Sequence, residues 1–290
     1  MAAAADTALA GPVPSRRAFR KPRPTPLEYG RKRWLQAVVA LNFIFLYFPI
    51  VSLIAFSFND SKRNVTWQGF TLKYYDQAFH NSGLQEAFLR SIGIALTSTV
   101  LSTVIGSLLG LAIYRYRFPL KGPFEGLIYL PIVIPEICMA MAMRSYFGAM
   151  NIPLGFITIA ISHIAFSFPF VAVVVRSRMS GFDESLEEAS RDLGASPRQT
   201  FFNVTLPYMT PGIIAGALLA FTLSLDDYVI TAFTSGPGST TFPVKIYSMV
   251  RQSVTPEVNA ASTILIVLTL TVTVVAMWIQ SRSGSKSIAS

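Results

Sequence analysis

Apolar residues in this chain gather in long blocks, each able to cross the roughly 30 Å hydrocarbon core of a bilayer as a helix. Such a crossing needs about 20 predominantly apolar residues, because a helix rises about 1.5 Å per residue. Hydrophobic residues make up 52% of the sequence and charged residues only 13%, which indicates a membrane protein. We therefore expect an all-α integral membrane protein with six transmembrane helices, at 34–58, 87–114, 126–150, 154–175, 211–233 and 258–280.

The distribution of basic residues predicts the orientation of these helices. Most of the 24 Lys and Arg residues lie beside the ends of the blocks on one side of the predicted membrane. Because cytoplasmic segments carry the excess of Lys and Arg, we expect both termini in the cytoplasm. The membrane domain spans 34–280, between a disordered basic tail at 1–33 and a second cytoplasmic tail at 281–290. Topology thus accounts for the formal charge of +9, and we do not expect nucleic-acid binding.

A polar segment at 181–207, between the fourth and fifth blocks, carries the start and stop signals of two short helices. Acidic residues crowd its first turns, which suits the positive N-terminal end of a helix. Gly194 stands where a helix needs a left-handed residue after its last turn. Ser196 can cap a second helix that has Pro197 in its first turn. The segment therefore predicts a helix, a glycine turn and a second helix.

Apolar residues give each of these short helices an apolar face. On the first helix they recur at helical spacing as Phe182, Leu186, Ala189 and Leu193. On the second they are Phe201, Phe202, Val204 and Leu206, and we expect Pro207 and Pro211 to end that helix. Taken alone, this pattern would also fit a loop that packs against its own membrane bundle.

The same segment resembles the EAA signature of permeases from ATP-binding-cassette (ABC) importers. In that signature Glu-Ala-Ala is followed after three residues by Gly, and after nine more by Ile-x-Leu-Pro. The spacing matches here throughout, at Glu188, Ala189, Ser190, Gly194, Val204, Leu206 and Pro207. Ser190 replaces the second alanine and Val204 replaces isoleucine, and both are small changes of size.

This resemblance implies the transmembrane subunit of a type I ABC importer in a bacterial inner membrane, with coupling helices in the segment 181–207. The implied partners are a second homologous permease, two ATP-binding subunits, an extracytoplasmic substrate-binding protein and the lipid bilayer. The sequence contains no Gly-x-x-x-x-Gly-Lys-Ser/Thr phosphate loop. We therefore expect ATP and magnesium on the separate ATPase subunit, and no catalytic residue, cofactor or metal site in this chain.

The resemblance also implies which residues of the loop couple to the ATPase. We expect Phe182, Leu186 and Leu193 to be apolar anchors and Glu188 to make a charged contact. The other coupling positions are Glu187, Ala189, Ser190, Gly194, Val204, Leu206 and Pro207.

Outside the loop, the chain resembles the spermidine/putrescine permeases specifically. The likeness rests on 220–230, 235–238, 242–251 and 255–260, on 130–136 in the third block, and on His163 with Pro169 in the fourth. It implies a polyamine cargo. The alternative is an ABC permease for another small polar solute.

Three acidic residues, Glu136, Asp226 and Asp227, fall deep within predicted spans. An ionised carboxylate facing lipid would cost about 2.5 to 3.5 kcal/mol, so each should face water or a partner charge. We expect at least one to line the translocation path and meet a polyamine ammonium group, helped by the aromatic faces of Tyr228 or Phe166. Adjacent helical residues point about 100° apart, so only one of the two aspartates should face the path. The other interpretation is an ion pair with a basic residue that stabilises the bundle.

Two residue types inside the spans indicate local irregularity. Pro131 and Pro135 must interrupt the hydrogen-bond ladder of the third span beside Glu136, which indicates a functional cavity. His163 could be a proton-sensitive gate, but a lone histidine in an apolar span more often hydrogen-bonds to a neighbouring helix.

Two other functions compete with ABC transport. An intramembrane enzyme could hold a magnesium ion on Asp226 and Asp227, but no acid at 230, 231 or 234 extends their face. A proton-coupled carrier predicts broken helices repeated in both halves, and the sequence shows no such duplication.

Overall fold

The computed structural model describes residues 33–61, 66–252 and 255–285. It divides into two units, residues 1–52 and 53–290. Most of helix α2 (Arg33–Phe56) belongs to the first unit, where none of its side chains is buried. A helix of this length and composition suits contact with lipid. The expected N-terminal tail lies outside the described residues apart from Arg33, which opens α2.

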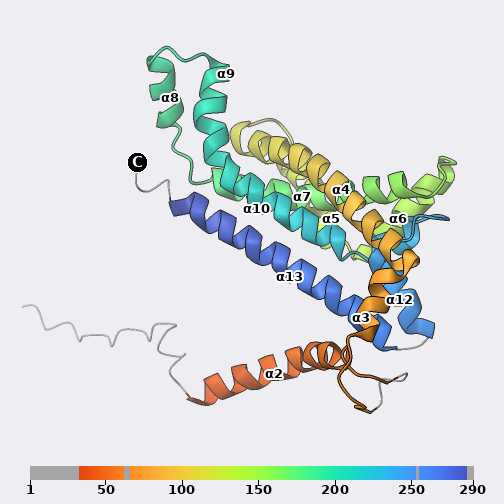
Figure 1. The fold of residues 1–290 in the computed structure, drawn as a ribbon. Coiled ribbons are helices and arrows are strands. Elements are labelled where there is room, and N and C mark those ends of the chain that lie inside the picture. Colours follow the sequence, from red (N-terminus) through yellow and green to blue (C-terminus); the bar gives the residue numbers. More distant parts are fainter. Residues whose placement is uncertain (1–32, 62–65, 253–254, 286–290) are drawn as a thin grey trace, which may run out of the picture. The chain divides into compact units, whose positions relative to one another are not determined.

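In the described part of the second unit the regular elements are helices joined by turns and loops, and one isolated bridge pairs Asn59 with Phe70. In chain order its elements are α3 (Lys73–His80), α4 (Ser82–Arg115), α5 (Lys121–Val133), α6 (Glu136–Ala149), α7 (Phe156–Met179), α8 (Ser185–Asp192), α9 (Pro197–Thr200), the π-helix η1 (Phe201–Thr205), α10 (Leu206–Leu225), α11 (Val229–Thr234), α12 (Phe242–Gln252) and α13 (Pro256–Ser285). The long helices α4, α7 and α10 pack side by side and form its centre (Figure 1).

Glycines spaced four residues apart bring these three helices close together. On α4, an added Cβ at Gly106 would lie 2.6 Å from the Phe168 carbonyl oxygen, and one at Gly110 would lie 2.7 Å from the Ala172 carbonyl oxygen. On α10, an added Cβ at Gly212 would lie 2.8 Å from Arg178 Cβ, and one at Gly216 would lie 2.9 Å from Val171 Cγ1, both on α7. Small residues at this spacing let helix backbones approach closely in membranes, where van der Waals packing drives association. The close contact of α4, α7 and α10 therefore depends on these glycines.

Within the part of the chain that the structure describes, five helices are long and apolar enough to cross a membrane: α2, α4, α7, the continuous stretch Pro197–Leu225, and α13. The expected third span is two helices, α5 and α6, bent by 103° relative to each other. Pro135 causes the break, because it lacks an amide hydrogen and forces Ile134 into an extended conformation with ψ of 134°. Pro131 lies inside α5 without ending it. The predicted interruption is confirmed at Pro135, and the six-span count holds if the bent pair is one span.

The prediction that Pro207 and Pro211 end the second loop helix is wrong. The π-helix directly precedes Pro207, and the Leu206 amide bonds to the carbonyl of Phe201 instead of the usual fourth residue back. Pro207 comes just after this π-helix, whose altered hydrogen bonding lets the chain stay helical, and Pro211 lies within α10. The fifth span therefore begins in the loop and ends at Leu225, short of the predicted boundary at 233.

Candidate functional site: a carboxylate cluster and a docking loop

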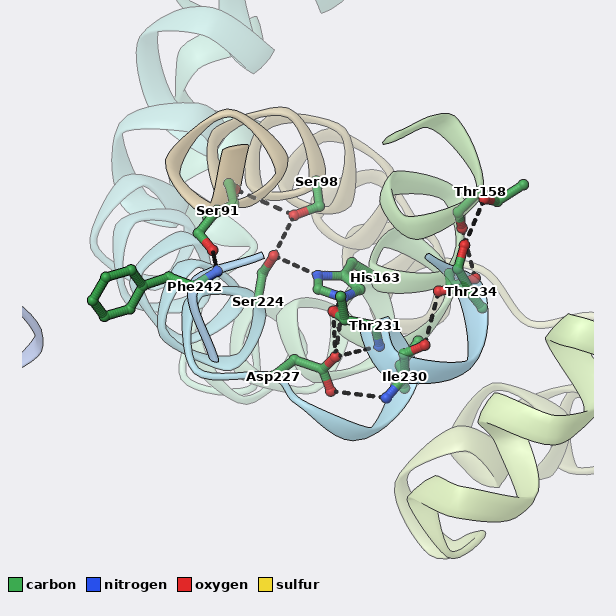
Figure 2. Close-up of polar contacts among 12 residues, drawn as sticks. Ser91, Ser98, Thr158, His163, Ser224, Asp227, Ile230, Thr231, Thr234 and Phe242 are labelled. Atoms are coloured by element: carbon green, nitrogen blue, oxygen red, sulfur yellow. Dashed lines mark hydrogen bonds and ion pairs between the residues drawn. The ribbon is translucent and has the colours of Figure 1, made fainter. Parts of the chain in front are cut away.

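Helices α10 and α11 are separated by a short non-helical turn at 226–228, and the carboxylate of Asp227 organises it. Its Oδ1 accepts hydrogen bonds of 2.8 Å from both the backbone amide and the hydroxyl of Thr231, and Oδ2 accepts one of 3.3 Å from the Ile230 amide (Figure 2). The first amides of a helix have no partner within the helix, and a carboxylate there is stabilised by the helix dipole. Asp227 therefore acts as the cap of α11.

His163 on α7 connects this cap to the central helices. Its Nε2 lies 3.2 Å from Asp227 Oδ1 and 3.0 Å from the Thr231 hydroxyl, and its Nδ1 lies 2.7 Å from the Ser224 hydroxyl. Ser224 in turn accepts a hydrogen bond of 2.9 Å from Ser98 on α4 (Figure 2). All these side chains are buried, so the network fixes four helices relative to one another. The prediction that His163 hydrogen-bonds to neighbouring helices is confirmed.

The two adjacent aspartates face different surroundings, but not for the predicted reason. The helix ends at Leu225, so the angle between neighbouring helical side chains does not apply. Asp226 is exposed whereas Asp227 is buried, because the turn directs Asp227 back onto the first amides of α11. Only Asp226 remains accessible to a cargo from this pair.

Glu136 approaches the same place from the other broken pair of helices. It is the first residue of α6, half-buried, and α6 packs against α11. Its carboxyl group interacts electrostatically with those of both Asp226 and Asp227. The structure thus brings together the three acids that were expected at depth, at the point where the breaks before α6 and before α11 meet. No lysine or arginine forms an ion pair with them among the described residues, and the side chain of His163 lies 3.2 Å from Asp227.

The two aromatic residues expected to help bind a cation are both half-buried. The Tyr228 ring lies 4.3 Å from that of Tyr247 on α12, and the Arg251 guanidinium lies 6.0 Å from the Tyr247 ring. The Phe166 ring pairs edge to face with Phe170 at 5.4 Å. Tyr228 follows Asp227 directly and therefore belongs to the same turn, whereas Phe166 lies on α7 one turn beyond His163.

The loop at 181–207 has the predicted order of helix, glycine turn and helix. Gly194 has a φ of +87° after α8, and Ser196 caps α9 in a capping box with Gln199. Leu193 is 90% exposed and Leu186 49% exposed, so both are available to a partner. The remaining coupling candidates are exposed at Glu188, Ala189, Gly194 and Pro207 and half-buried at Ser190, Val204 and Leu206.

Phe182 differs from the other expected apolar anchors because it is buried within this chain. It precedes α8, so it does not share a helical face with Leu186 and Leu193. Its ring packs at 4.9 Å from Tyr208 and joins the core formed with Val175 and Met179. Phe182 therefore attaches the loop to the spans of its own bundle in this conformation.

Sequence reasoning did not anticipate the surroundings of Glu187. This side chain is buried, and its carboxylate is bound by Arg115 at the end of α4 and by the hydroxyl of Thr205 in the π-helix. Arg191, one turn further along α8, also lies 3.5 Å from it. No spacing in the sequence indicates the pairing of Glu187 with Arg115, because the two residues are 72 positions apart.

Comparison with known proteins gives consistent matches over most of the chain. The family described as "Binding-protein-dependent transport system inner membrane component" matches residues 102–286. The spermidine/putrescine transport system permease protein PotC of Escherichia coli (strain K12) is 43% identical over 244 residues, which cover 84% of this chain and 92% of PotC. The putrescine transport system permease protein PotI of the same strain is 36% identical over 265 residues, covering 89% of this chain and 94% of PotI.

Solved structures show the same fold at lower sequence identity. A bacterial ABC transporter involved in the import of alginate matches with a TM-score of 0.68 at 17% identity, covering 89% of this chain and 99% of the other. An inward-facing MetNI methionine ABC transporter matches with a TM-score of 0.59 at 20% identity, covering 69% and 95%. The arrangement of helices is therefore that of ABC transporter membrane subunits.

Proposed function

This chain belongs to the family of inner membrane components of binding-protein-dependent transport systems, and on that basis we propose that it is a permease subunit of an ABC importer for polyamines. It is a multi-pass protein of the inner membrane, and the relatives PotC and PotI are named as permeases for spermidine/putrescine and for putrescine. The observation that supports a cationic cargo is the cluster of Glu136, Asp226 and Asp227, which has no lysine or arginine partner among the described residues.

The chemistry of this cluster suits an alkyl ammonium cargo. Inside a membrane, ionisable side chains line water-filled pathways or pair with other charges, because exposure to lipid is costly. Asp227 is already bonded to α11 and His163, whereas Asp226 is exposed and Glu136 is half-buried. We assign contact with the cargo to Asp226 and Glu136, and the shape of the turn to Asp227. Tyr228 and Phe166 would offer aromatic faces to the alkyl ammonium groups.

The rest of the machinery comes from other chains. We propose that a second homologous permease completes the pathway, that two ATP-binding subunits carry ATP and magnesium, and that an extracytoplasmic protein delivers the cargo. The exposed Leu186, Glu188 and Leu193 would dock the loop into an ATP-binding subunit. Both termini and this loop would then lie in the cytoplasm, in accordance with the excess of basic residues on that side.

Transport in this scheme requires no bond chemistry in the chain itself. ATP binding inside and docking of the binding protein outside would each favour one of two conformations, and a ligand shifts such an equilibrium by its differential affinity. The broken helices α5–α6 and α10–α11 meet at the carboxylates, so a change in their angle would change access to the cluster.

Asp226→Asn and Glu136→Gln in the reconstituted transporter test this assignment. Each should raise the putrescine concentration needed for half-maximal uptake at least tenfold, because each removes one charge from the path. Thr269→Ala, which changes a hydroxyl bonded only to its own helix, is the control and should leave uptake unchanged. If both acid variants transported putrescine like the unmodified protein, these carboxylates would not be cargo ligands.

A further inference from the structure

Glu187 and Glu188 are adjacent acids on α8, yet they face opposite environments. Glu188 belongs to the EAA signature and is exposed, whereas Glu187 is only 7% exposed. Both oxygens of the Glu187 carboxylate are engaged by the Arg115 guanidinium, one of them at 3.3 Å. The Thr205 hydroxyl donates to the same carboxylate from the π-helix. One buried side chain thus joins α8, the end of α4 and the base of α10.

The position of this contact matters because α8 has few other attachments to the spans. It packs against α9 and the π-helix, and the chain connects it to α7 and α10 at its two sides. Helix α4 is far from α8 in the sequence, with α5, α6 and α7 between them. It nevertheless packs along both α7 and α10. Beside the ion pair, the Tyr114 hydroxyl lies 3.5 Å from the Phe182 carbonyl oxygen. The Glu187 contact therefore bridges the loop to the helix at the centre of the bundle.

We propose that Glu187 and Arg115 are positioning residues that make α4 move together with α8 when the ATPase moves the loop. This inference rests on the proposed function. It adds α4 to the two spans, α7 and α10, that the loop joins directly. A two-pronged guanidinium–carboxylate contact fixes orientation as well as distance. Glu187 is buried whereas Arg115 is partly exposed, so separating the pair would leave the Glu187 carboxylate uncompensated, and the two helices remain joined as the loop moves.

Charge reversal in the complete reconstituted transporter, with its partner permease, ATPase and binding protein, tests this link. The variants are Glu187→Gln, Arg115→Gln and the swapped double variant Glu187→Arg with Arg115→Glu. Putrescine taken up per ATP hydrolysed is measured for each, together with the amount of ATPase bound to the complex. Glu86→Gln is the matched control, because Glu86 forms an exposed ion pair of 3.2 Å with Arg90 elsewhere on α4.

We expect each single variant to bind the ATPase and to transport at least fivefold less putrescine per ATP, and the swapped variant to recover at least half of the loss. The Glu86→Gln control should match the unmodified protein. Uptake per ATP within twofold of normal in both single variants would overturn the proposal. If a single variant failed to assemble, the swap would decide: recovery supports the link, and an assembled but uncoupled swap overturns it. Uptake without any ATPase would instead refute the proposed function, whatever these variants do.

Discussion

Asp227→Ala tests most sharply whether this acid shapes the turn or binds the cargo. The substitution removes the acceptor for the amides of Ile230 and Thr231 and for the Thr231 hydroxyl, and it leaves His163 without its carboxylate. Asp227 and His163 have side chains that are each 2% exposed, so water cannot replace the lost contacts without rearrangement. Each buried donor left without an acceptor costs about 1 to 3 kcal/mol, so losing these three hydrogen bonds should cost about 3 to 5 kcal/mol in total.

This loss of stability converts into a measurable shift of the melting temperature. For a chain of this size, 1 kcal/mol lowers the unfolding midpoint by about 2 to 4 °C, so Asp227→Ala should lower it by roughly 6 to 20 °C. The assay is thermal unfolding of the purified protein in detergent. The unfolding midpoint of Asp227→Asn should lie between those of Asp227→Ala and the unmodified protein. Its amide oxygen can still accept from Thr231, while the charge beside His163 is lost.

The adjacent residue provides the control for this prediction. Asp226 is exposed, so Asp226→Ala should shift the midpoint by no more than about 2 °C, as expected of a surface substitution. The reasoning would be refuted if Asp227→Ala unfolded at the same temperature as the unmodified protein, or if the two alanine variants lowered the unfolding midpoint equally.

Three further predictions follow from the glycines and the loop. Gly110→Val should destabilise the bundle by about 1 to 3 kcal/mol in thermal unfolding, since its Cβ would lie 2.7 Å from the Ala172 carbonyl oxygen. Gly126→Ala adds a methyl group in open space and should leave the stability unchanged. Equal stability of the two variants would show that close packing at Gly110 does not stabilise the bundle. Gly194→Val should reduce ATP-driven uptake because a branched residue strains a φ of +87°, while Gly194→Asn should retain most of it; equal loss in both would point away from backbone conformation. Leu193→Asp should weaken ATPase binding at least tenfold in a pull-down titration, because this side chain is 90% exposed and apolar; unchanged binding would remove it from the docking surface.

The spans and the loop helices could be predicted because they depend on local rules. A helix across a bilayer needs a long apolar block, and α2, α4, α7 and α13 follow such blocks closely. Gly194 and Ser196 take the conformations that their residue types favour at helix ends. Glu136 and the two aspartates were expected to face water or a partner charge, since exposure to lipid is costly, but their grouping at one place was not predicted.

What the sequence could not supply depends on contacts between distant segments. The turn at Asp227 lies inside a predicted span that continues to residue 233, and the Asp227 carboxylate is held there both by the local amides of α11 and by the distant residue His163. The π-helix before Pro207 lets the chain stay helical at a proline that would ordinarily end a helix. The burial of Phe182 likewise follows from its contact with Tyr208. The glycine pairs on α4 and α10 were a signal in the sequence, as small residues four positions apart, that hydrophobicity alone does not detect.

The central claim is that this chain imports a polyamine only as part of an ATP-driven complex. The most direct measurement is uptake of radiolabelled putrescine into vesicles that contain the chain and its partner permease, with the binding protein added, in the presence and absence of the ATPase subunit and ATP. The proposed function predicts uptake when ATPase and ATP are both present and background levels when either is left out. Equal uptake with and without the ATPase would contradict it.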